Sequence, residues 1–203
     1  FVFFNDDFFI LAPVEPADFF RDGRPQLRGK WLNPFKLKVK AYLRGKGLLA
    51  PSQSRIDRKE LMWRSARLAG IEGRYFFNDH TPHPFLKSRQ EQFYGDFPQY
   101  LTQNAGHRYR DQSQYNVAAL ADHLEIAAGH ADFVAPRLTY LSPSQKGNSL
   151  RYVRRKLARS AREQHQFACV QSLDQCSPEA RAMIESWLDA VIQPAQTPPS
   201  HGA

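Results

Sequence analysis

The chain opens with a run of apolar residues that is broken once by three polar ones. It reads Phe1-Val2-Phe3-Phe4, then Asn5-Asp6-Asp7, then Phe8-Phe9-Ile10-Leu11. Each apolar piece is rich in strand-forming residues and too short for a surface helix, which predicts two short strands. Two adjacent carboxylates between apolar strands are costly to bury unless they meet a cation or hydrogen-bond donors. This segment therefore indicates a fold with a buried sheet and a polar loop between two strands.

The Asn5-Asp6-Asp7 sequence has two interpretations. Two carboxylates in an apolar setting suit a hard divalent cation such as Mg²⁺, which takes oxygen ligands and leaves positions for phosphate. The alternative is a hairpin turn with solvated side chains, which the flanking strands also fit. Because the sequence starts with Phe1 inside an apparent core strand, we also expect that an N-terminal neighbour, including part of the sheet, is missing.

Composition and patterning indicate a domain of mixed class. The 203 residues are 42% hydrophobic and 24% charged, which allows one sizeable core and argues against wholesale disorder. Strand patterns alternate with helix patterns, which predicts an α/β fold with a layered, mixed sheet and flanking helices, incomplete at the N-terminus. We expect one domain over residues 1–192, a basic surface excursion over 24–53 and a disordered tail over 193–203.

Local signals place the expected elements along the chain. Asp22-Gly23 predicts a turn, and Ser177-Pro178 is typical of a helix start. Apolar periodicity predicts helices over residues 35–43, 57–69, 85–97, 113–128, 149–162 and from 177 onward. Short strands are expected over residues 73–77, 133–140 and 167–170.

The formal net charge of +8 favours an anionic partner: nucleic acid, a membrane surface or a phosphorylated substrate. The basic helix over residues 151–162 is the best candidate for the first two. Its simpler interpretation is a solvated helix with Tyr152, Val153 and Leu157 packed inward. A non-catalytic basic module that binds nucleic acid or an anionic surface is therefore the alternative function, although the sequence has no RNP-like or zinc-finger motif.

Three further groups of residues are candidates for chemistry. His80 and His83 lie in a proline-fixed loop, where imidazoles can bind a metal or act as a base; the alternative is one structural and one exposed histidine. If their polar loop is extended, Arg108 and Arg110 share one side, where their guanidiniums suit phosphate oxygens; the alternative is that they are ordinary surface residues. The two cysteines, at 169 and 176, show no metal spacing and are expected to be free thiols, with a mutual disulfide as the alternative.

Together these segments resemble the Stealth family of sugar-phosphate transferases, which includes bacterial capsular phosphotransferases and the animal N-acetylglucosamine-1-phosphotransferase. The segment FVFFNDDFFILAPVEPADFFRDGRP resembles the second conserved block of that family. The third block is matched by HTPHPFLKSRQEQFYGDFP and continues in HRYRDQSQYNVAALADHLEIAAG. The fourth is matched by FACVQSLDQCSPEARAMIESWLDAVIQP, with Gln171-Ser172 where the family commonly has Asn-Asp. The first block is absent from this sequence.

The resemblance implies a glycosyltransferase-like fold and a metal-dependent transfer of a sugar-1-phosphate from a nucleotide-sugar to a hydroxyl of a glycan, in capsule or exopolysaccharide synthesis. The expected cofactor is Mg²⁺ or Mn²⁺. The expected partners are the nucleotide-sugar donor and the glycan acceptor, without nucleic acid and with peripheral membrane association. The implied location is the cytoplasm, at the inner face of the membrane.

The resemblance also implies roles for individual residues. Asp6 and Asp7 would serve the metal and the diphosphate, His80 would be the base, and Arg110 would bind phosphate, so that Asp7, His80 and Arg110 form the catalytic set. The remaining substrate-binding residues are expected to be Asn5, Arg74, His83 and Arg108.

Overall fold

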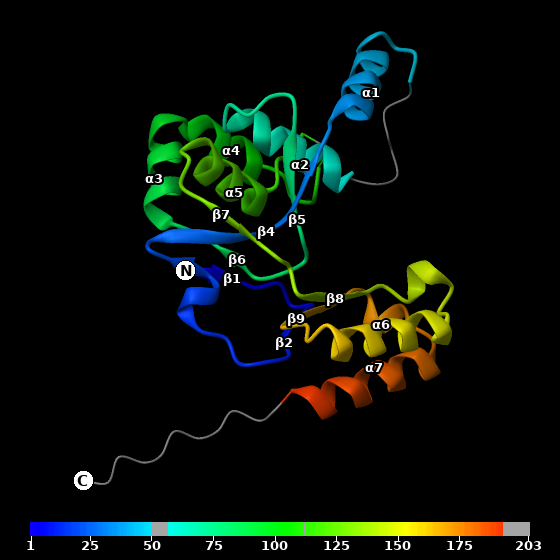
Figure 1. Cartoon of the computed structure of the whole chain (residues 1–203). Helices are drawn as coiled ribbons and strands as arrows, with labels where there is room; N and C mark the ends of the chain where they lie inside the picture. The colour runs from blue at the N-terminus through cyan, green and yellow to red at the C-terminus, as the bar shows by residue number, and fades with distance from the viewer. Residues whose placement is uncertain (50–56, 112, 193–203) are drawn as a thin grey trace, which may run out of the picture. The chain divides into compact units, whose positions relative to one another are not determined.

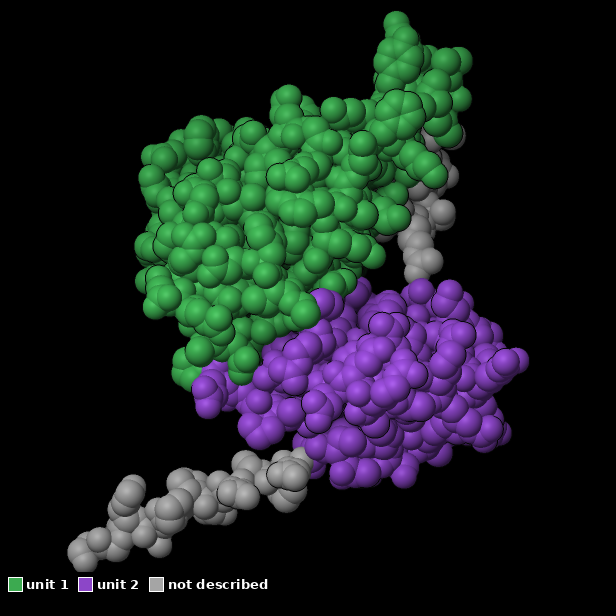
Figure 2. Space-filling view, viewed as in Figure 1, with its two compact units in different colours: residues 1–3, 16–79, 83–135 green, residues 4–15, 80–82, 136–203 purple. Residues whose placement is uncertain are grey.

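Strands and helices alternate along the chain, and mixed sheets with flanking helices confirm the predicted α/β class (Figure 1). The computed structural model describes residues 1–49, 57–111 and 113–192. It divides into two compact units (Figure 2). Unit 1 holds Phe1–Phe3, Pro16–Asp79 and His83–Ala135, and unit 2 holds Phe4–Glu15, His80–Pro82 and the chain from Pro136 onward. The expected tail over 193–203 lies outside the described residues.

Unit 1 is built around a four-stranded mixed sheet. Its strands are β3 (Phe20–Arg21), β4 (Arg24–Leu32), β5 (Tyr75–Asn78) and β7 (Asp132–Val134). Strand β4 is antiparallel to β3 and β5 and parallel to β7. The Asp22-Gly23 turn joins β3 to β4 with φ angles of 50° and 76°, which a two-residue hairpin turn requires. A second sheet pairs β1 (Val2–Phe3) with β6 (His83–Pro84).

Strand β4 corrects the expectation that residues 24–53 form a surface excursion. Four consecutive residues of this strand, 25–28, are buried because strands pair with both of its edges. The basic residues concealed the strand from sequence reasoning: Arg28 is buried, and its guanidinium donates hydrogen bonds to the carbonyls of Gln26 and Asp18. Residues 50–53 of this segment lie outside the described part of the chain.

The helices of unit 1 lie largely where the sequence predicts them. They are α1 (Phe35–Gly45), α2 (Arg58–Leu68), α3 (Lys87–Asp96), α4 (Pro98–Ala105) and α5 (Val117–Ala127). Helix α4 was not expected; Pro98 occupies one of its first positions, where proline is well tolerated. Met62, Ala66, Tyr75 and Ala119 form a core in which α2 and α5 pack on β5.

Helix α5 also carries buried polar groups into unit 1. Asn78 donates a hydrogen bond of 2.9 Å to Oδ2 of Asp122, whereas Oδ1 of Asp122 is buried without a partner among the described residues. Burial raises the pKa of Asp122 to about 7. Burial likewise lowers the pKa of His123 to about 4, and Nε2 of this neutral ring accepts the Phe76 N–H at 2.9 Å.

Unit 2 contains a three-stranded sheet covered by two helices on one face (Figure 1). The strands are β2 (Phe8–Ile10), β8 (Leu138–Leu141) and β9 (Phe167–Val170), and the helices are α6 (Leu150–Arg162) and α7 (Pro178–Val191). Strand β9 is central, antiparallel to β2 and parallel to β8. Leu141 and Val170 of the sheet pack with Val153 of α6 and Ile184 of α7.

The single strand predicted over residues 133–140 is two strands in different units. Strand β7 belongs to unit 1 and β8 to unit 2, and the intervening residues include Pro136 and a left-handed Arg137 with a φ of 42°. The two helices of unit 2 match their predictions, with Ser149 and Ser177 as N-caps. No helix in the described ranges has the length and apolar character that crossing a bilayer requires.

Replacing Gly29 by alanine should weaken the pairing of β4 with β5. A Cβ atom at this position would lie 2.5 Å from the carbonyl oxygen of Phe77 and 2.8 Å from Cα of Asn78, so the two backbones would have to separate. We expect a loss of about 1–3 kcal/mol in the free energy of unfolding, measured by chemical denaturation. In the control Gly95→Ala, a Cβ within α3 meets nothing within 4 Å, so stability should be unchanged or higher. Equal stability of Gly29→Ala and the wild type would contradict this close approach.

Asp122→Asn should change how stability depends on pH. Between about pH 4 and 7 the folded state keeps a proton on Asp122 that the unfolded chain has released, so stability contributed by this group falls as the pH rises through that window. The free energy of unfolding of Asp122→Asn relative to the wild type should therefore increase by up to about 1.4 kcal/mol per pH unit. Urea unfolding of both proteins at several pH values measures this difference. His123 is present in both proteins, so its own contribution to the pH dependence cancels.

The matched control for this pH series is Asp132→Asn. Hydrogen bonds from Gln26 and Arg24 lower the pKa of the Asp132 carboxyl. The free energy of unfolding of Asp132→Asn relative to the wild type should therefore decrease as the pH rises, and it should do so at lower pH than the change for Asp122→Asn. A pH-independent difference for Asp122→Asn would show that its carboxyl is not buried in the folded state.

Candidate functional site

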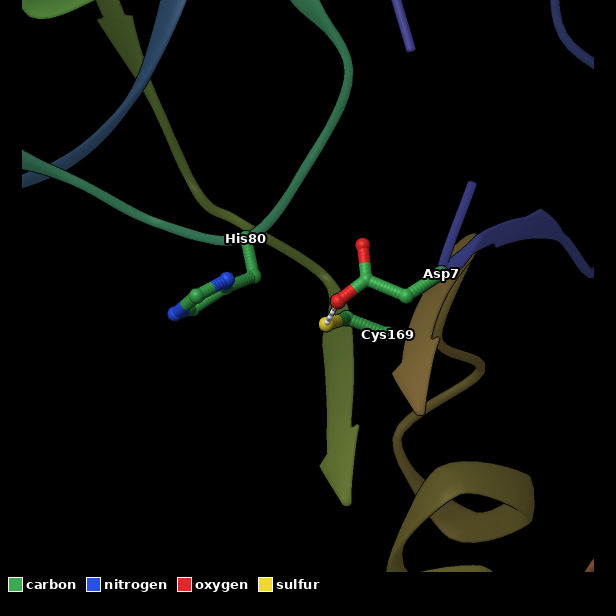
Figure 3. Close-up of side chains that lie close together, drawn as sticks. All are labelled: Asp7, His80 and Cys169. Atoms are coloured by element: carbon green, nitrogen blue, oxygen red, sulfur yellow. Dashed lines mark hydrogen bonds between the residues drawn. The ribbon is translucent and has the colours of Figure 1, made fainter. Parts of the chain in front are cut away.

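Asp7, His80 and Cys169 lie side by side in unit 2 (Figure 3). One ligand atom of each residue, an oxygen, a nitrogen and the sulfur, lies within 4.8 Å of the other two. The thiol of Cys169 donates a hydrogen bond of 3.3 Å to Oδ2 of Asp7, across 162 residues of sequence. The structure therefore brings together one carboxylate and one imidazole that the sequence singled out, and it adds a thiol.

The register of the sheet explains why Cys169 faces this site. Within the sheet, Cys169 pairs with Phe8 on β2 and with Tyr140 on β8, so these three side chains share one face. Side chains alternate along a strand, and the next residues, Val170 and Leu141, belong to the core that packs on α6 and α7. The row that contains Cys169 therefore points to the opposite face from the two helices.

Two aromatic rings of this row hold the imidazole of His80. It stacks on the ring of Tyr140 at a centroid distance of 4.8 Å and an interplanar angle of 26°. The ring of Phe8 meets it edge-on at 6.5 Å. The hydroxyl of Tyr140 donates to Oε1 of Gln171 at 2.5 Å, which fixes the ring on which His80 rests. The imidazole is thus oriented by packing rather than left on a mobile surface loop.

Asp7 ends the polar loop that precedes β2. Its carbonyl oxygen accepts the Val170 N–H at 3.0 Å, which ties the loop to β9. Its Oδ1 atom is buried without a hydrogen-bond partner in the described part of the chain. Because β1 pairs with β6 and β2 pairs with β9, the alternative interpretation of Asn5-Asp6-Asp7 as the turn of a two-stranded hairpin is wrong.

The other sequence-predicted residues fall in two places. Asn5 and Asp6 are exposed on the same loop as Asp7, in unit 2. The remaining four, Arg74, His83, Arg108 and Arg110, belong to unit 1, so they are not brought together with Asp7 and His80 within one unit.

Local contacts show how two of these unit 1 residues are held. The guanidinium of Arg74 lies 4.1 Å from the ring of Trp31, a cation–π contact on an exposed side chain. His83 is buried on β6, and its ring is nearly parallel to that of Phe85 at 6.5 Å. Arg108 and Arg110 are exposed in a loop.

Sequence reasoning did not assign Cys169 to a site. The spacing of the two cysteines predicts free thiols, with a mutual disulfide as the alternative, and both cysteines are free thiols. Neither interpretation predicts that Cys169 lies next to Asp7, because the pairing of β2 with β9 brings these two residues together. The one available signal was the position of Cys169 in the segment that resembles the fourth conserved block.

The donor atoms around Asp7 allow a test of the expected metal. Mg²⁺ prefers oxygen ligands, and Asp7 supplies a carboxylate whose buried Oδ1 has no hydrogen-bond partner among the described residues. However, the neighbours of that carboxylate are an imidazole nitrogen and a thiol sulfur rather than the side chain of Asp6. This donor set differs from the oxygen-only set that Mg²⁺ prefers, and Mg²⁺ or Mn²⁺ on Asp6 and Asp7 stays a prediction.

Comparison with known proteins finds similarity to two polysaccharide phosphotransferases, while no family model matches the chain. One is the capsular polysaccharide phosphotransferase WcwK of Streptococcus pneumoniae, and the other is the receptor polysaccharide phosphotransferase WefC of Streptococcus oralis. Each is 30% identical over an aligned length of 159 residues, which covers 68% of this chain and 46% of the relative. The chain thus spans about half the length of the curated relatives it matches.

The two thiols should differ in their reaction with iodoacetamide. Cys169 is 0% exposed and should be protected in the folded chain, whereas Cys176 is half-buried. Burial raises the pKa of the Cys176 thiol, so its alkylation should be slow at neutral pH and accelerate as the pH rises. Intact mass and peptide mapping should find one modification, at Cys176, and a second only after unfolding. Equal rates at both cysteines, or labelling of folded Cys176→Ser, would contradict the burial of Cys169.

Proposed function

Starting from this similarity, we propose that the chain carries part of the active site of a Stealth-family transferase. The enzyme would move a sugar-1-phosphate from a nucleotide-sugar onto a hydroxyl of a glycan, in the synthesis of a capsule or exopolysaccharide. The two relatives are polysaccharide phosphotransferases by name, which supports the general reaction class. The donor, the acceptor and the transferred group are those that the family resemblance implies.

The observation that carries this proposal is the proximity of Asp7 and His80. The two residues come from different motifs, far apart in the sequence, and their ligand atoms lie within 4.8 Å of each other in unit 2. Transfer of a phosphoryl group to a hydroxyl needs a group that takes the hydroxyl proton and groups that position the phosphate. An oriented imidazole can take the hydroxyl proton, and the carboxylate beside it can help to position the phosphate by holding a cation.

In the proposed reaction, the acceptor hydroxyl gives its proton to a ring nitrogen of His80. The hydroxyl oxygen forms a bond to the phosphorus that carries the sugar, and the bond from that phosphorus to the bridging oxygen of the diphosphate breaks. A nucleoside monophosphate leaves, and a phosphodiester joins the sugar to the acceptor. Packing against Tyr140 and Phe8 restricts the orientation of the His80 ring, which favours proton transfer along one direction.

Arginine side chains would bind the phosphate oxygens of the donor. In this proposal Arg110 takes that role with Arg108, because a guanidinium stays charged and can donate two parallel hydrogen bonds to phosphate. Asn5, Arg74 and His83 complete the proposed substrate contacts. The divalent ion that the resemblance implies, Mg²⁺ or Mn²⁺, would neutralise charge on the diphosphate, and Asp6 and Asp7 are the residues that would hold it.

The proposed setting is the cytoplasm at the inner face of the membrane, without nucleic acid as a partner. Exposed arginines of α6, Arg151, Arg154 and Arg155, would supply peripheral contact with anionic lipid. Arg159 and Arg162 of the same helix are instead paired with Glu163. The alternative, a non-catalytic basic module, predicts that neither Asp7 nor His80 matters, so one experiment separates the two functions.

Asp7→Asn and His80→Ala should each lower turnover at least about 100-fold, because His80→Ala removes the proposed base and Asp7→Asn removes a proposed ligand of the ion that neutralises the diphosphate. The measurement is release of nucleoside monophosphate and formation of the phosphodiester by the complete gene product, supplied with candidate nucleotide-sugars and polysaccharide acceptor.

Asp174→Asn is the matched control for this activity assay, because Asp174 is an exposed carboxylate of unit 2 outside the site. It should retain wild-type turnover. If Asp7→Asn and His80→Ala were also as active as the wild type, the site assignment would be wrong.

A further inference from the structure

The three side chains that meet in unit 2 offer three kinds of metal ligand. Asp7 offers carboxylate oxygen, His80 an imidazole nitrogen and Cys169 a thiol sulfur, all within 4.8 Å of one another. Ligand atoms around one tetrahedral zinc ion are roughly 3.5 Å apart, because the bonds to the metal are about 2.0 to 2.3 Å long. The ligand atoms would therefore have to approach one another by at most about 1.3 Å, a distance on the scale of side-chain rotation.

One oxygen of the cluster, on Asp7, lacks the partner that a buried acceptor needs. Oδ2 of Asp7 accepts the thiol hydrogen of Cys169 at 3.3 Å, but Oδ1 is buried without a partner among the residues described. A buried acceptor that lacks a hydrogen bond is costly to the fold. A cation would remove that cost and would displace the thiol proton to solvent, since the thiolate is the form that binds metal.

The kinds of donor indicate the class of ion. Hard ions such as Mg²⁺ select oxygen ligands, whereas thiolate sulfur and imidazole nitrogen favour Zn²⁺. Zn²⁺ also exceeds Mn²⁺ in the usual order of affinities for divalent ions. We propose that Asp7, His80 and Cys169 bind Zn²⁺, in place of the Mg²⁺ or Mn²⁺ that the family resemblance implies for this loop.

The fold holds the proposed ligands on well-supported positions. Cys169 lies on the central strand β9, paired on both edges, and Asp7 is tied to that strand through the Val170 N–H. His80 packs on Tyr140, directly beside Cys169 in the sheet. Three protein ligands leave the fourth position of a tetrahedral ion open, as in catalytic zinc sites. When Zn²⁺ is bound, His80 is its ligand and not the proton acceptor of the proposed reaction. That a phosphate oxygen of the donor takes the open position rests on the proposed transfer; the binding of Zn²⁺ does not.

Titration of the 203-residue chain with Co²⁺ tests the proposal, because a cobalt–thiolate bond gives a near-ultraviolet absorption band that oxygen and nitrogen ligands do not give. We expect the band in the wild type and in the matched control Cys176→Ser, which removes the other thiol. Cys169→Ser should abolish it. His80→Gln should weaken Co²⁺ binding at least about 100-fold, since loss of even an outer partner of a metal ligand costs 10–100-fold.

Competition and folding controls complete the test. A stoichiometric amount of Zn²⁺ should bleach the Co²⁺ band, whereas a large excess of Mg²⁺ should leave it. Circular dichroism identifies any variant that does not fold, and His80→Gln, which changes a half-buried loop residue, keeps the test decisive if Cys169→Ser unfolds. Absence of a thiolate band in the wild type, its survival in both folded variants, or its loss to Mg²⁺ would overturn the proposal.

Parallel transferase assays keep the two proposals distinguishable. A wild type that shows no thiolate band, together with inactive Asp7→Asn and His80→Ala, would refute the zinc site and leave the transferase proposal standing. A zinc-displaceable band, together with transfer that is indifferent to Asp7 and His80, would refute the transferase site and leave the zinc site standing.

Discussion

The pairing register of β2, β9 and β8 determines which side chains of unit 2 can meet. Phe8, Cys169 and Tyr140 form one row across that sheet because the three residues are paired in register. A slip of one residue would turn Cys169 towards the helices and Val170 away from them. The hydrophobic core of Leu141 and Val170 with α6 and α7 opposes such a slip. Apolar packing on one face therefore fixes the polar chemistry presented on the other.

Both units contain a carboxylate that has one buried oxygen without a hydrogen-bond partner among the described residues, but the surroundings of the two carboxylates differ. Asp122 receives one hydrogen bond from Asn78, and its raised pKa shows that burial favours the protonated, neutral form. Asp7 instead lies beside an imidazole and a thiol, both of which can ligate a metal. The first arrangement suits a structural group in a dry core, and the second suits a site that binds a charged partner.

The parts of the fold that depend on local chemistry could be predicted from the sequence. Ser149, Ser177 and the Asp22-Gly23 turn mark their elements because capping and turn geometry involve neighbouring residues. Strand β4 could not, because the pairing that buries Arg28 comes from distant strands. The division of residues 133–140 between two units has the same origin. In the site, motifs indicated Asp7 and His80, but the position of Cys169 follows from strand pairing, which no local pattern specifies.

The pairing of β2 with β9 has a consequence for how the protein is made. Strand β9 is translated about 160 residues after β2, which takes roughly 10 to 30 s at ordinary elongation rates. Throughout that interval Phe8, Phe9 and Ile10 have no strand to join, and such aromatic segments are the ones that misassociate in crowded surroundings. The sheet of unit 2 can thus form only after β9 has been made, and until then the nascent chain is a natural client for chaperones that shield aromatic segments.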